Sequence, residues 1–399
     1  MLKSMFKVVY IDYQSGDKRY PNTLNDGDRF FTYGFASIYA RKFKKYNPEI
    51  NVECWKADSR IKDIYTKNIE NVQYILFPSK KIGKLGHYSA KLNSHLKKEL
   101  KIGGKVIFNI SSIRHLLFYS LALQLKNYPL VVQHHGESTA IHKAKINKGL
   151  KKLFYASQIP FEKYCFKNID LFFVLDERIK EYLPKSNEKL KVEASTTGVD
   201  EELFYPLDKI EAKKLLGWNI NKKHILYVGR LNYTKRPDIL IDIYKDFKKE
   251  GIKDIELVLA GNEKDDPLYK KAEESGAVLY PKILQTELYK YLSAADVYIL
   301  PKYISDHSFG GIGMLPVQAL LCNTPIVGAT VALFPVEDRD KIGLIANDQS
   351  SISNAINQIV FSKNKFINLR LYAQKYYSWE NISKKTANWY NKILRVYEF

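Results

Sequence analysis

The stretch from Ile225 to Pro237 carries the residues best suited to bind an anion. It reads I-L-Y-V-G-R-L-N-Y-T-K-R-P: an apolar run ends at Gly229, Arg230 and Lys235 follow, and Pro237 opens a helical pattern. A strand, a glycine turn and a helix start point backbone N–H groups and the positive end of a helix dipole at a ligand. Arg230 offers a planar fork for phosphate oxygens and Lys235 a point charge. The pattern predicts a phosphate site; the alternative is a surface turn with solvated cations.

Short apolar runs alternate with longer helical patterns along the chain, which is typical of parallel sheets built from βαβ units. In the first half, strands are expected at residues 6–11, 52–55, 72–77, 105–110, 130–133, 171–175 and 191–194. In the second half, they are expected at residues 225–228, 255–260, 278–280, 297–300, 325–327 and 343–345. The expected helices include residues 29–46, 113–125, 237–249, 286–294, 315–321 and 350–362. Ligands of such sheets bind at the carboxyl ends of the strands.

The net charge and the cysteine content limit which partners and which cellular compartment are expected. The net charge of +20 over 399 residues predicts a polyanionic partner, either anionic lipid, nucleic acid or a phosphorylated substrate, unless it is a compositional bias of a lysine-rich chain. Cys54, Cys165 and Cys322 lie far apart, which argues against a disulfide framework or a zinc site and fits a reducing cytosol. We expect no signal peptide, and no apolar run approaches the ~18–20 residues of a membrane span. The predicted location is cytoplasmic, or peripheral on the inner face of the cell membrane.

One amphipathic stretch is relevant to whether the protein binds a membrane surface. Between His142 and Phe166 the apolar residues Ile146, Leu150, Leu153 and Phe154 alternate with lysines at 143, 145, 148, 151 and 152. This spacing predicts a basic helix with one apolar stripe. Such a helix either lies on a membrane surface or, as most amphipathic helices do, covers a core with its apolar stripe.

Five stretches, in order, resemble a known family. They are Gln133–Gly136 (Q-H-H-G), Thr197–Pro206 (T-G-V-D-E-E-L-F-Y-P), the G-R-L-x-x-x-K block at Gly229–Lys235, Ala295–Pro301 (A-D-V-Y-I-L-P) and Gly313–Gly328. Together they resemble the GT-B glycosyltransferases of family 4, the glycosyl transferases group 1. The resemblance is strongest over residues 195–345 and thin before residue 130.

The resemblance implies an α/β fold of two tandem, doubly wound Rossmann-like domains that face each other across a cleft. Residues 1–205 would form an acceptor domain, and residues 206–380 a nucleotide-sugar donor domain. Ser378-Trp379 opens a helix similar to the family's last one. This helix, at about residues 381–399, would cross back to the acceptor domain.

Site residues follow from the resemblance, position by position. Arg230 and Lys235 would bind the donor diphosphate, assisted by the helix start at Gly310 and Gly311. Ile283 stands where the family holds the nucleobase, although the usual glycine of that turn is Lys282. His135 is the expected catalytic-site contact near the reacting carbon; the alternative is a structural histidine.

The donor loop departs from the family pattern. The family usually carries E-x7-E there, and Gly310 and Gln318 occupy the two positions. Gln318 can still hydrogen-bond a ribose, without charge assistance. Gly310 cannot contact a sugar through a side chain. Asp306 or His307 would substitute as a sugar contact, unless both belong to an ordinary polar loop.

The implied activity is retaining transfer of a sugar from a nucleoside-diphosphate sugar to a glycan, lipid-linked or other acceptor in cell-surface glycan biosynthesis. In this family the cations replace a metal, so no metal or other cofactor is expected, and no nucleic acid is expected as a partner. The first alternative is a degenerate member that binds a nucleotide sugar or a partner without catalysis. A metal-dependent transferase using D-x-D, at Asp26–Asp28 or Asp338–Asp340, is a further alternative. A nucleic-acid-binding protein is supported by charge alone.

Overall fold

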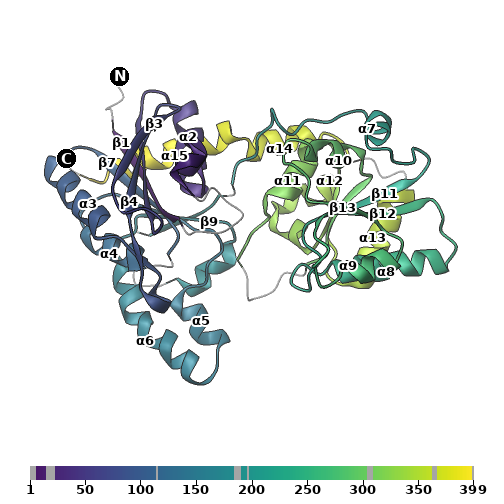
Figure 1. The fold of residues 1–399 in the computed structure, drawn as a ribbon, viewed down its shortest axis with the longest axis horizontal. Coiled ribbons are helices and arrows are strands. Elements are labelled where there is room, and N and C mark those ends of the chain that lie inside the picture. The colour runs from purple at the N-terminus through teal and green to yellow at the C-terminus, as the bar shows by residue number, and fades with distance from the viewer. Residues whose placement is uncertain are drawn as a thin grey trace. The chain divides into compact units, whose positions relative to one another are not determined.

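The computed structural model describes residues 6–14, 23–113, 116–183, 190–195, 197–302, 309–361 and 366–397. The chain divides into two compact units (Figure 1). Unit 1 comprises Met1–Ser195, His307–Gly310 and Trp379–Phe399, and unit 2 comprises Thr196–Asp306 and Gly311–Ser378.

Unit 1 is built on a sheet with the strand order β10-β9-β8-β7-β1-β2-β4-β3 among the described residues. Its strands are β1 (Lys7–Gln14), β2 (Asn51–Asp58), β3 (Tyr65–Ile69), β4 (Val72–Pro78), β7 (Val106–Ser111), β8 (Leu130–Gln133), β9 (Leu171–Val174) and β10 (Lys191–Ala194). Neighbours pair in parallel except β3 and β4, which are antiparallel. The short strands β5 (Lys80–Lys81) and β6 (His87–Tyr88) pair with each other separately.

Helices cover both faces of the unit 1 sheet. They are α1 (Asp28–Thr32), α2 (Phe35–Tyr46), α3 (Ala90–Ile102), α4 (Leu116–Gln124), α5 (Ala140–Ile146), α6 (Gly149–Phe166) and α15 (Trp379–Leu394). Alternate residues of β1 enter different cores: Val9 and Ile11 pack in the core with α3, α4 and α6, whereas Val8 and Tyr10 pack in the core with α2 and α15. This alternation is the two-residue period of a strand buried on both faces.

Unit 2 contains a fully parallel sheet of order β13-β12-β11-β14-β15-β16. Its strands are β11 (Lys223–Val228), β12 (Ile255–Asn262), β13 (Val278–Pro281), β14 (Val297–Leu300), β15 (Ile326–Gly328) and β16 (Gly343–Leu344). Its helices are α7 (Lys209–Leu215), α8 (Pro237–Lys249), α9 (Tyr269–Glu274), α10 (Leu288–Ala294), α11 (Met314–Leu321), α12 (Arg339–Ile342), α13 (Gln349–Phe361) and α14 (Leu369–Tyr377). One core joins α8, α9 and α13 to the sheet, and the other joins α7, α10, α11 and α14.

The prediction of an α/β chain with two Rossmann-like sheets is confirmed, with two local corrections. The helix expected at residues 29–46 is divided into α1 and α2 at Gly34, whose φ is +99°. A side chain at that φ would be strained, so the helix restarts after the glycine. The edge strand β3 is missing from the prediction because Tyr65–Ile69 is polar and mostly exposed.

The chain passes from unit 1 to unit 2 at Ser195, earlier than the predicted boundary at residue 205. The reason is that the connecting segment is bonded within unit 2. Arg370 donates hydrogen bonds to the carbonyl oxygens of Phe204 (2.7 Å) and Glu201 (3.0 Å). The backbone N–H of Val199 donates to the carbonyl oxygen of Tyr377, the last residue of α14, at 2.9 Å.

Helix α15 returns the end of the chain to unit 1. Tyr390 of this helix is fully buried, accepts a hydrogen bond from Asn109 Nδ2 at 2.8 Å and lies 3.3 Å from the hydroxyl of Tyr10. The helix therefore joins the strands β7 and β1 through one buried hydroxyl group. Burial makes this small network costly to break.

We expect Tyr390→Ala to lower the unfolding free energy of unit 1 by about 3–5 kcal/mol, because it leaves a cavity and two unpaired polar groups. Tyr390→Phe, which removes only the hydroxyl, should cost about 1–2 kcal/mol. Chemical denaturation measures both values. Tyr164→Phe, at an exposed tyrosine of the same unit, is the control and should change little. Equal stability of Tyr390→Ala and wild type would contradict the assigned packing.

Candidate functional site

The strand order marks one expected binding position in each unit. In unit 2 the strands run outward from β11 on one side and from β14 on the other, and in unit 1 from β1 and β7. Doubly wound sheets bind ligands at the carboxyl ends of the two strands where the order reverses. The register pairs Leu226 with Tyr298 in unit 2 and Ile11 with Ile110 in unit 1. The loop after β11 and the end of β1 are therefore the expected ligand positions.

Glycines bring the strand ends of β11 and β12 close together in unit 2. Gly229 follows β11 and donates its N–H to Ala260 at 2.8 Å. A Cβ on Gly229 would lie 2.8 Å from the hydroxyl oxygen of Tyr227, and one on Gly261 would lie 3.4 Å from the nitrogen of Gly229. The first contact is too short for a side chain, and at Gly261 the φ of +81° would strain one. The structure adds Gly261, at the end of β12, to the predicted loop; the A-G-N sequence after an apolar run was the available signal.

Arg230 is already engaged by carboxylates. Its Nε and Nη2 atoms each lie 2.8 Å from Asp266, and Glu263 and Asp265 lie 3.8 and 3.9 Å from Nη2. Burial acts to raise the pKa of Asp266, but backbone N–H groups of Glu263 and Leu231 and the guanidinium outweigh it, so the pKa is lowered. Asp266 therefore stays ionised and holds Arg230. A diphosphate must share or displace this partner.

Lys235 offers the accessible cation of the predicted pair. It is exposed and forms no ion pair with any other residue that the structure describes. Its backbone N–H is bonded to Asn232 Oδ1 at 3.1 Å, which fixes the turn before α8. Pro237 is the first residue of α8, as the sequence predicts, because proline suits that position. Roughly half of the Arg230 side chain is also exposed.

The other residues predicted for the donor site lie in different parts of the structure. Gly311 belongs to unit 2, whereas Gly310 belongs to unit 1, so the predicted diphosphate set is divided between the units. Gln318 is buried on α11, and Ile283 is partly buried against the core with α10 and α11. Asp306 and His307 lie outside the described residues. Their roles all stay predictions.

Gly310 joins unit 1 because the residue before it is buried there. Phe309 is 1% exposed and its ring lies 4.7 Å from that of His142 and 5.6 Å from that of Tyr182. Next to it, a Cβ on Gly136 would lie 3.3 Å from Gly310 Cα. The two glycines thus permit a close backbone approach directly after His135.

His135 has a stacked ring and two free nitrogens. The ring lies 4.3 Å from that of Phe35, at the start of α2, with an interplanar angle of 15°. Both ring nitrogens are buried and have no hydrogen-bond partner within the described ranges. Burial lowers the pKa of His135, while Glu137 acts to raise it. A neutral imidazole with an open donor and an open acceptor can hydrogen-bond a hydroxyl group.

Asp12 and Lys56, which were not among the predicted site residues, are paired neighbours near the carboxyl ends of β1 and β2 in unit 1. Asp12 is near the end of β1, and its Oδ1 accepts from the N–H of Tyr13 at 2.8 Å. Burial raises the pKa of Asp12 to about 7, although Lys56 acts to lower it. The Lys56 ammonium is buried and donates to the carbonyl of Phe31 at 2.9 Å. A carboxyl group at the end of an otherwise apolar strand was the signal available for Asp12.

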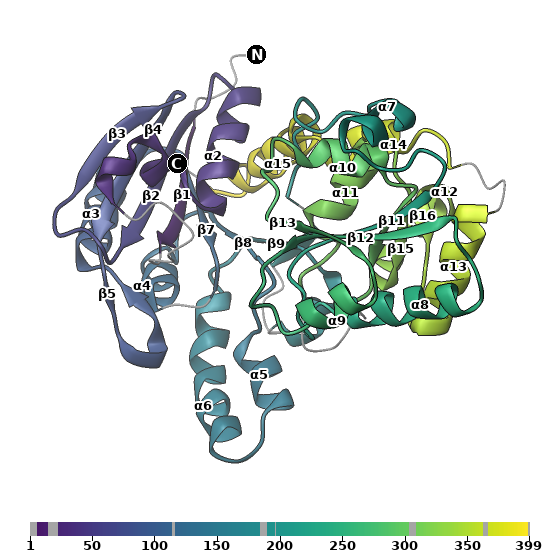
Figure 2. The ribbon, with the colours of Figure 1, turned by 45° about the vertical axis from the view of Figure 1, so that its right-hand side comes forward.

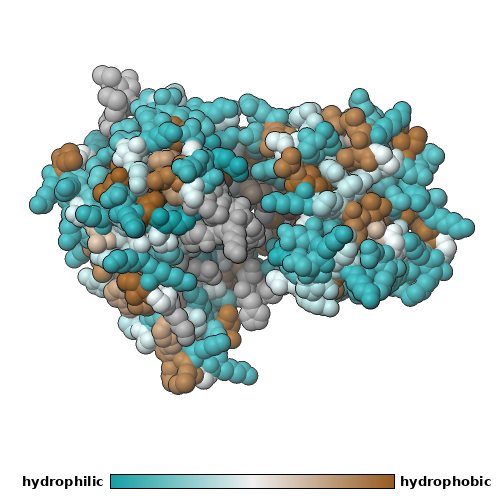
Figure 3. Space-filling view, viewed as in Figure 1, coloured by the Kyte–Doolittle hydropathy of each residue, from teal (hydrophilic) through white to brown (hydrophobic). Residues whose placement is uncertain are grey.

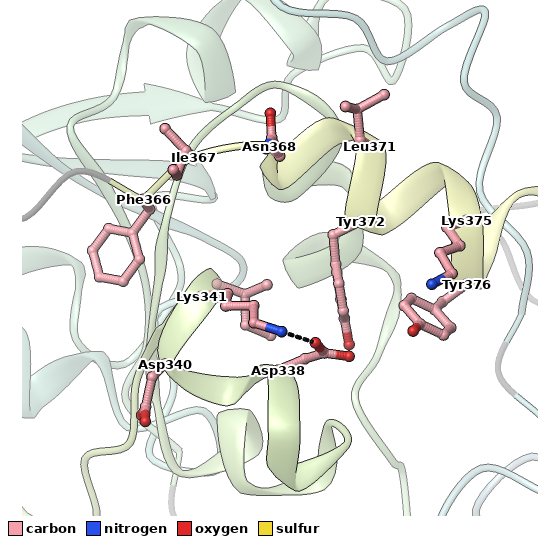
Figure 4. A pocket seen from close by; sticks show the side chains of 11 residues that line it. Asp338, Asp340, Lys341, Phe366, Ile367, Asn368, Leu371, Tyr372, Lys375 and Tyr376 are labelled. Atoms are coloured by element: carbon pink, nitrogen blue, oxygen red, sulfur yellow. Dashed lines mark hydrogen bonds and ion pairs between the residues drawn. The ribbon is translucent and has the colours of Figure 1, made fainter.

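A separate pocket of about 600 Å³ lies in unit 2 beside α12 and α14 (Figure 4). Asp338 and Asp340, the second D-x-D pair, line it together with Lys341 and Tyr372. Asp338 Oδ1 is 2.8 Å from Lys341 Nζ, and its Oδ2 has no hydrogen-bond partner among the described residues. The pair lies on the crossover between β15 and β16 rather than at a strand's carboxyl end.

The first D-x-D pair has local structural roles. Asp26 accepts from the backbone of Thr23 at 2.9 Å, and Asp28 lies 2.7 Å from Lys67 Nζ. Within the described ranges, no three His, Cys, Asp or Glu residues are grouped closely enough to hold a metal ion. In the same ranges no helix is long and apolar enough to cross a membrane.

Comparison with known proteins finds a family match that covers most of unit 2. Residues 208–376 match the family described as glycosyl transferases group 1. The D-inositol 3-phosphate glycosyltransferase of Mycobacterium marinum is 30% identical over 162 residues, which are 38% of this chain and 33% of that protein. The corresponding protein of Mycobacterium leprae is also 30% identical, over 38% of this chain and 36% of its own length. The chain thus spans about a third of the length of these curated relatives.

Solved structures match nearly the whole chain. Sucrose-phosphate synthase from Thermosynechococcus elongatus has a TM-score of 0.66 at 17% identity, covering 98% of this chain and 100% of that one. Anabaena HepE in complex with UDP has a TM-score of 0.64 at 14% identity, over 97% and 100%. WaaG, a glycosyltransferase involved in lipopolysaccharide biosynthesis, has 0.63 at 13%, over 96% and 98%.

The fold is therefore that of the GT-B proteins, as predicted. Residues 208–376 are similar to the glycosyl transferases group 1.

We expect His135 to stay neutral at neutral pH, because burial lowers its pKa below the ordinary 6.5. A lowered pKa in the folded state means that His135 stabilises the fold above pH 6.5 and that this contribution is lost as the pH falls. NMR titration of the imidazole C–H signals, assigned with His135→Asn, measures the pKa. The urea-unfolded chain provides the reference value. Titration at or above that reference would contradict the buried environment.

Proposed function

We propose that the chain is a retaining glycosyltransferase that moves a sugar from a nucleoside-diphosphate sugar to a glycan, lipid-linked or other acceptor in cell-surface glycan biosynthesis. The observation that carries this proposal is the Gly229–Lys235 loop. It follows β11 at the strand-order reversal, inside the span that matches glycosyl transferases group 1. HepE, solved in complex with UDP, and WaaG, involved in lipopolysaccharide biosynthesis, share the fold and support the donor and product classes.

Charge stabilisation is the proposed role of unit 2. Breaking the bond between the anomeric carbon and the phosphate leaves negative charge on the departing nucleoside diphosphate. Prearranged cations lower the cost of that charge separation. Lys235 is accessible for the diphosphate, and Arg230 contributes when a phosphate competes with Asp266. Gly311 would assist through its backbone, Gln318 and Ile283 would contact the nucleoside, and we propose that no metal is required.

Unit 1 is the proposed acceptor side. His135 would contact the sugar or the acceptor hydroxyl through one of its free ring nitrogens. Retention of configuration would follow from front-face attack, in which the leaving phosphate accepts the acceptor's proton. This route needs no protein nucleophile, and we assign none. The proposed location is cytoplasmic and peripheral on the inner face of the membrane, where a lipid-linked acceptor would be reached.

One observation favours a second function, nucleotide-sugar binding without transfer. Gly310 stands where the family's donor loop usually carries a carboxylate. The missing carboxylate removes a contact to the transferred sugar and leaves the cations Arg230 and Lys235 in place. Sugar transfer measured after binding is established separates the two functions.

We expect Lys235→Ala to weaken binding of a nucleoside diphosphate by roughly tenfold or more, since it removes a charge-assisted contact worth about 1.5–3 kcal/mol. Arg230→Ala should weaken binding less, because Asp266 already neutralises this cation. Thermal shift with UDP, GDP and ADP, with and without chelator, measures both effects. A ligand at ~100 times its dissociation constant should stabilise the protein by about 2.7 kcal/mol.

The matched control is Lys270→Ala, at an exposed lysine on α9 of the same unit. It should bind nucleotide as the wild type does. No shift with any of the three nucleotides would overturn the donor-site proposal. A shift abolished by chelator would overturn metal independence alone.

A further inference from the structure

Helices α5 and α6 form a hairpin that projects from unit 1 (Figures 1 and 2). They are joined at Asn147–Lys148, where Asn147 Nδ2 donates to the carbonyl of Lys143 at 2.8 Å. The first residues of α6, from Gly149 to Phe154, are all exposed. The end of the hairpin therefore extends past the core of unit 1.

The inner face of α6 attaches the hairpin to unit 1. Glu162, Cys165 and Phe166 on this face are buried. The Glu162 carboxylate accepts from the N–H of Ala140, at the start of α5, at 2.8 and 3.0 Å. It also accepts from the Tyr119 hydroxyl on α4 at 3.3 Å. The contacts of this face hold α6 against unit 1, so a second apolar face is not needed to attach the helix.

A second apolar face nevertheless exists and is open to solvent. Its side chains are Leu150 (85% exposed), Leu153 (66%), Tyr164 (52%), Phe161 (44%) and Phe154 (42%), which we call the outer stripe. At 3.6 residues per turn these positions fall within a sector about 100° wide. Exposed apolar residues scattered singly need no explanation, but an aligned stripe of five indicates an interaction surface.

The charge around the outer stripe is positive. The exposed lysines of the hairpin and its end are Lys145, Lys148, Lys151, Lys152, Lys163 and Lys167. Between residues 140 and 168 the sequence has one acidic residue, the buried Glu162. Brown and teal side chains lie next to each other at the free end of the hairpin in Figure 3. Lysines beside leucine and aromatic side chains are the composition of helices that lie in the headgroup region of anionic membranes.

We propose that the outer stripe docks on an anionic lipid bilayer, with its apolar side chains in the acyl boundary and its lysines among the headgroups. A second copy of the chain is a poorer occupant, because two such surfaces would oppose like charges. The inference deepens the proposed function, since it rests on a lipid-linked acceptor being approached by unit 1. It is tested by binding to vesicles alone, without nucleotide, so the two proposals fail separately.

The experiment is co-sedimentation of the full chain with vesicles of phosphatidylcholine or of phosphatidylcholine with phosphatidylglycerol. We expect binding only to the anionic vesicles, and weaker binding at high salt. Leu150→Glu/Leu153→Glu should reduce the bound fraction by roughly tenfold or more. The control with equal charge change is Ile102→Glu/Leu123→Glu, at exposed apolar residues of α3 and α4, which should bind as wild type.

Lys151→Gln/Lys152→Gln tests the electrostatic part. Each lysine near an anionic surface contributes about 1 kcal/mol, so the pair should weaken binding roughly tenfold or more, whereas Lys97→Gln/Lys98→Gln on α3 should not. Circular dichroism verifies that each variant is folded. Absence of vesicle binding, or equal loss in the control variants, would overturn the proposal. Self-association abolished by Leu150→Glu/Leu153→Glu without vesicle binding would assign the stripe to a second copy instead.

Discussion

The order of the parallel strands is the constraint on which both candidate sites depend. Crossover helices leave in opposite directions from β1 and β7 in unit 1 and from β11 and β14 in unit 2. At these positions the carboxyl ends of the strands are not covered by their own crossovers. Asp12 and Gly229 lie there because the registers of β1 and β11 place them there. Asp12 and Gly229 lie where these strands lead into the loops, whereas the residues before them in the strands are mostly apolar.

Electrostatic competition distinguishes the two cations of the donor loop. Asp266 accepts from the backbone of Leu231 as well as from Arg230, so it fixes the loop and neutralises the guanidinium at once. Lys235 has no such partner among the described residues. The Asp266 carboxylate thus ties Arg230 to the loop, with Glu263 and Asp265 as more distant acidic neighbours. Nucleotide binding would have to compensate for the loss or sharing of that ion pair.

Local sequence signals predicted an element correctly where neighbouring residues in the chain determine that element. Proline at the first position gave α8 its predicted start, and apolar runs predicted the parallel strands. Tertiary contacts explain what the sequence could not supply. Asp12 becomes unusual only because burial raises its pKa, and Gly310 joins unit 1 only because Phe309 packs against His142 and Tyr182. The spacing of residues predicted that Arg230 and Lys235 lie in the loop. It did not predict the acidic partners of Arg230, which follow about one crossover helix and one strand later in the chain.

The hairpin shows that an amphipathic pattern can indicate either a face that packs on a core or a face that is exposed. A period of 3.6 residues shows that apolar side chains share a face, but not whether that face meets a core. In α6 the core is met by a different set, centred on Glu162 and Cys165, and the stripe visible in the sequence through Leu150, Leu153 and Phe154 is left exposed. The buried acid removes the one negative charge from the surface of the hairpin. Its exposed charge is consequently of one sign, which favours a negatively charged, partly apolar surface as the partner over another region of this basic chain.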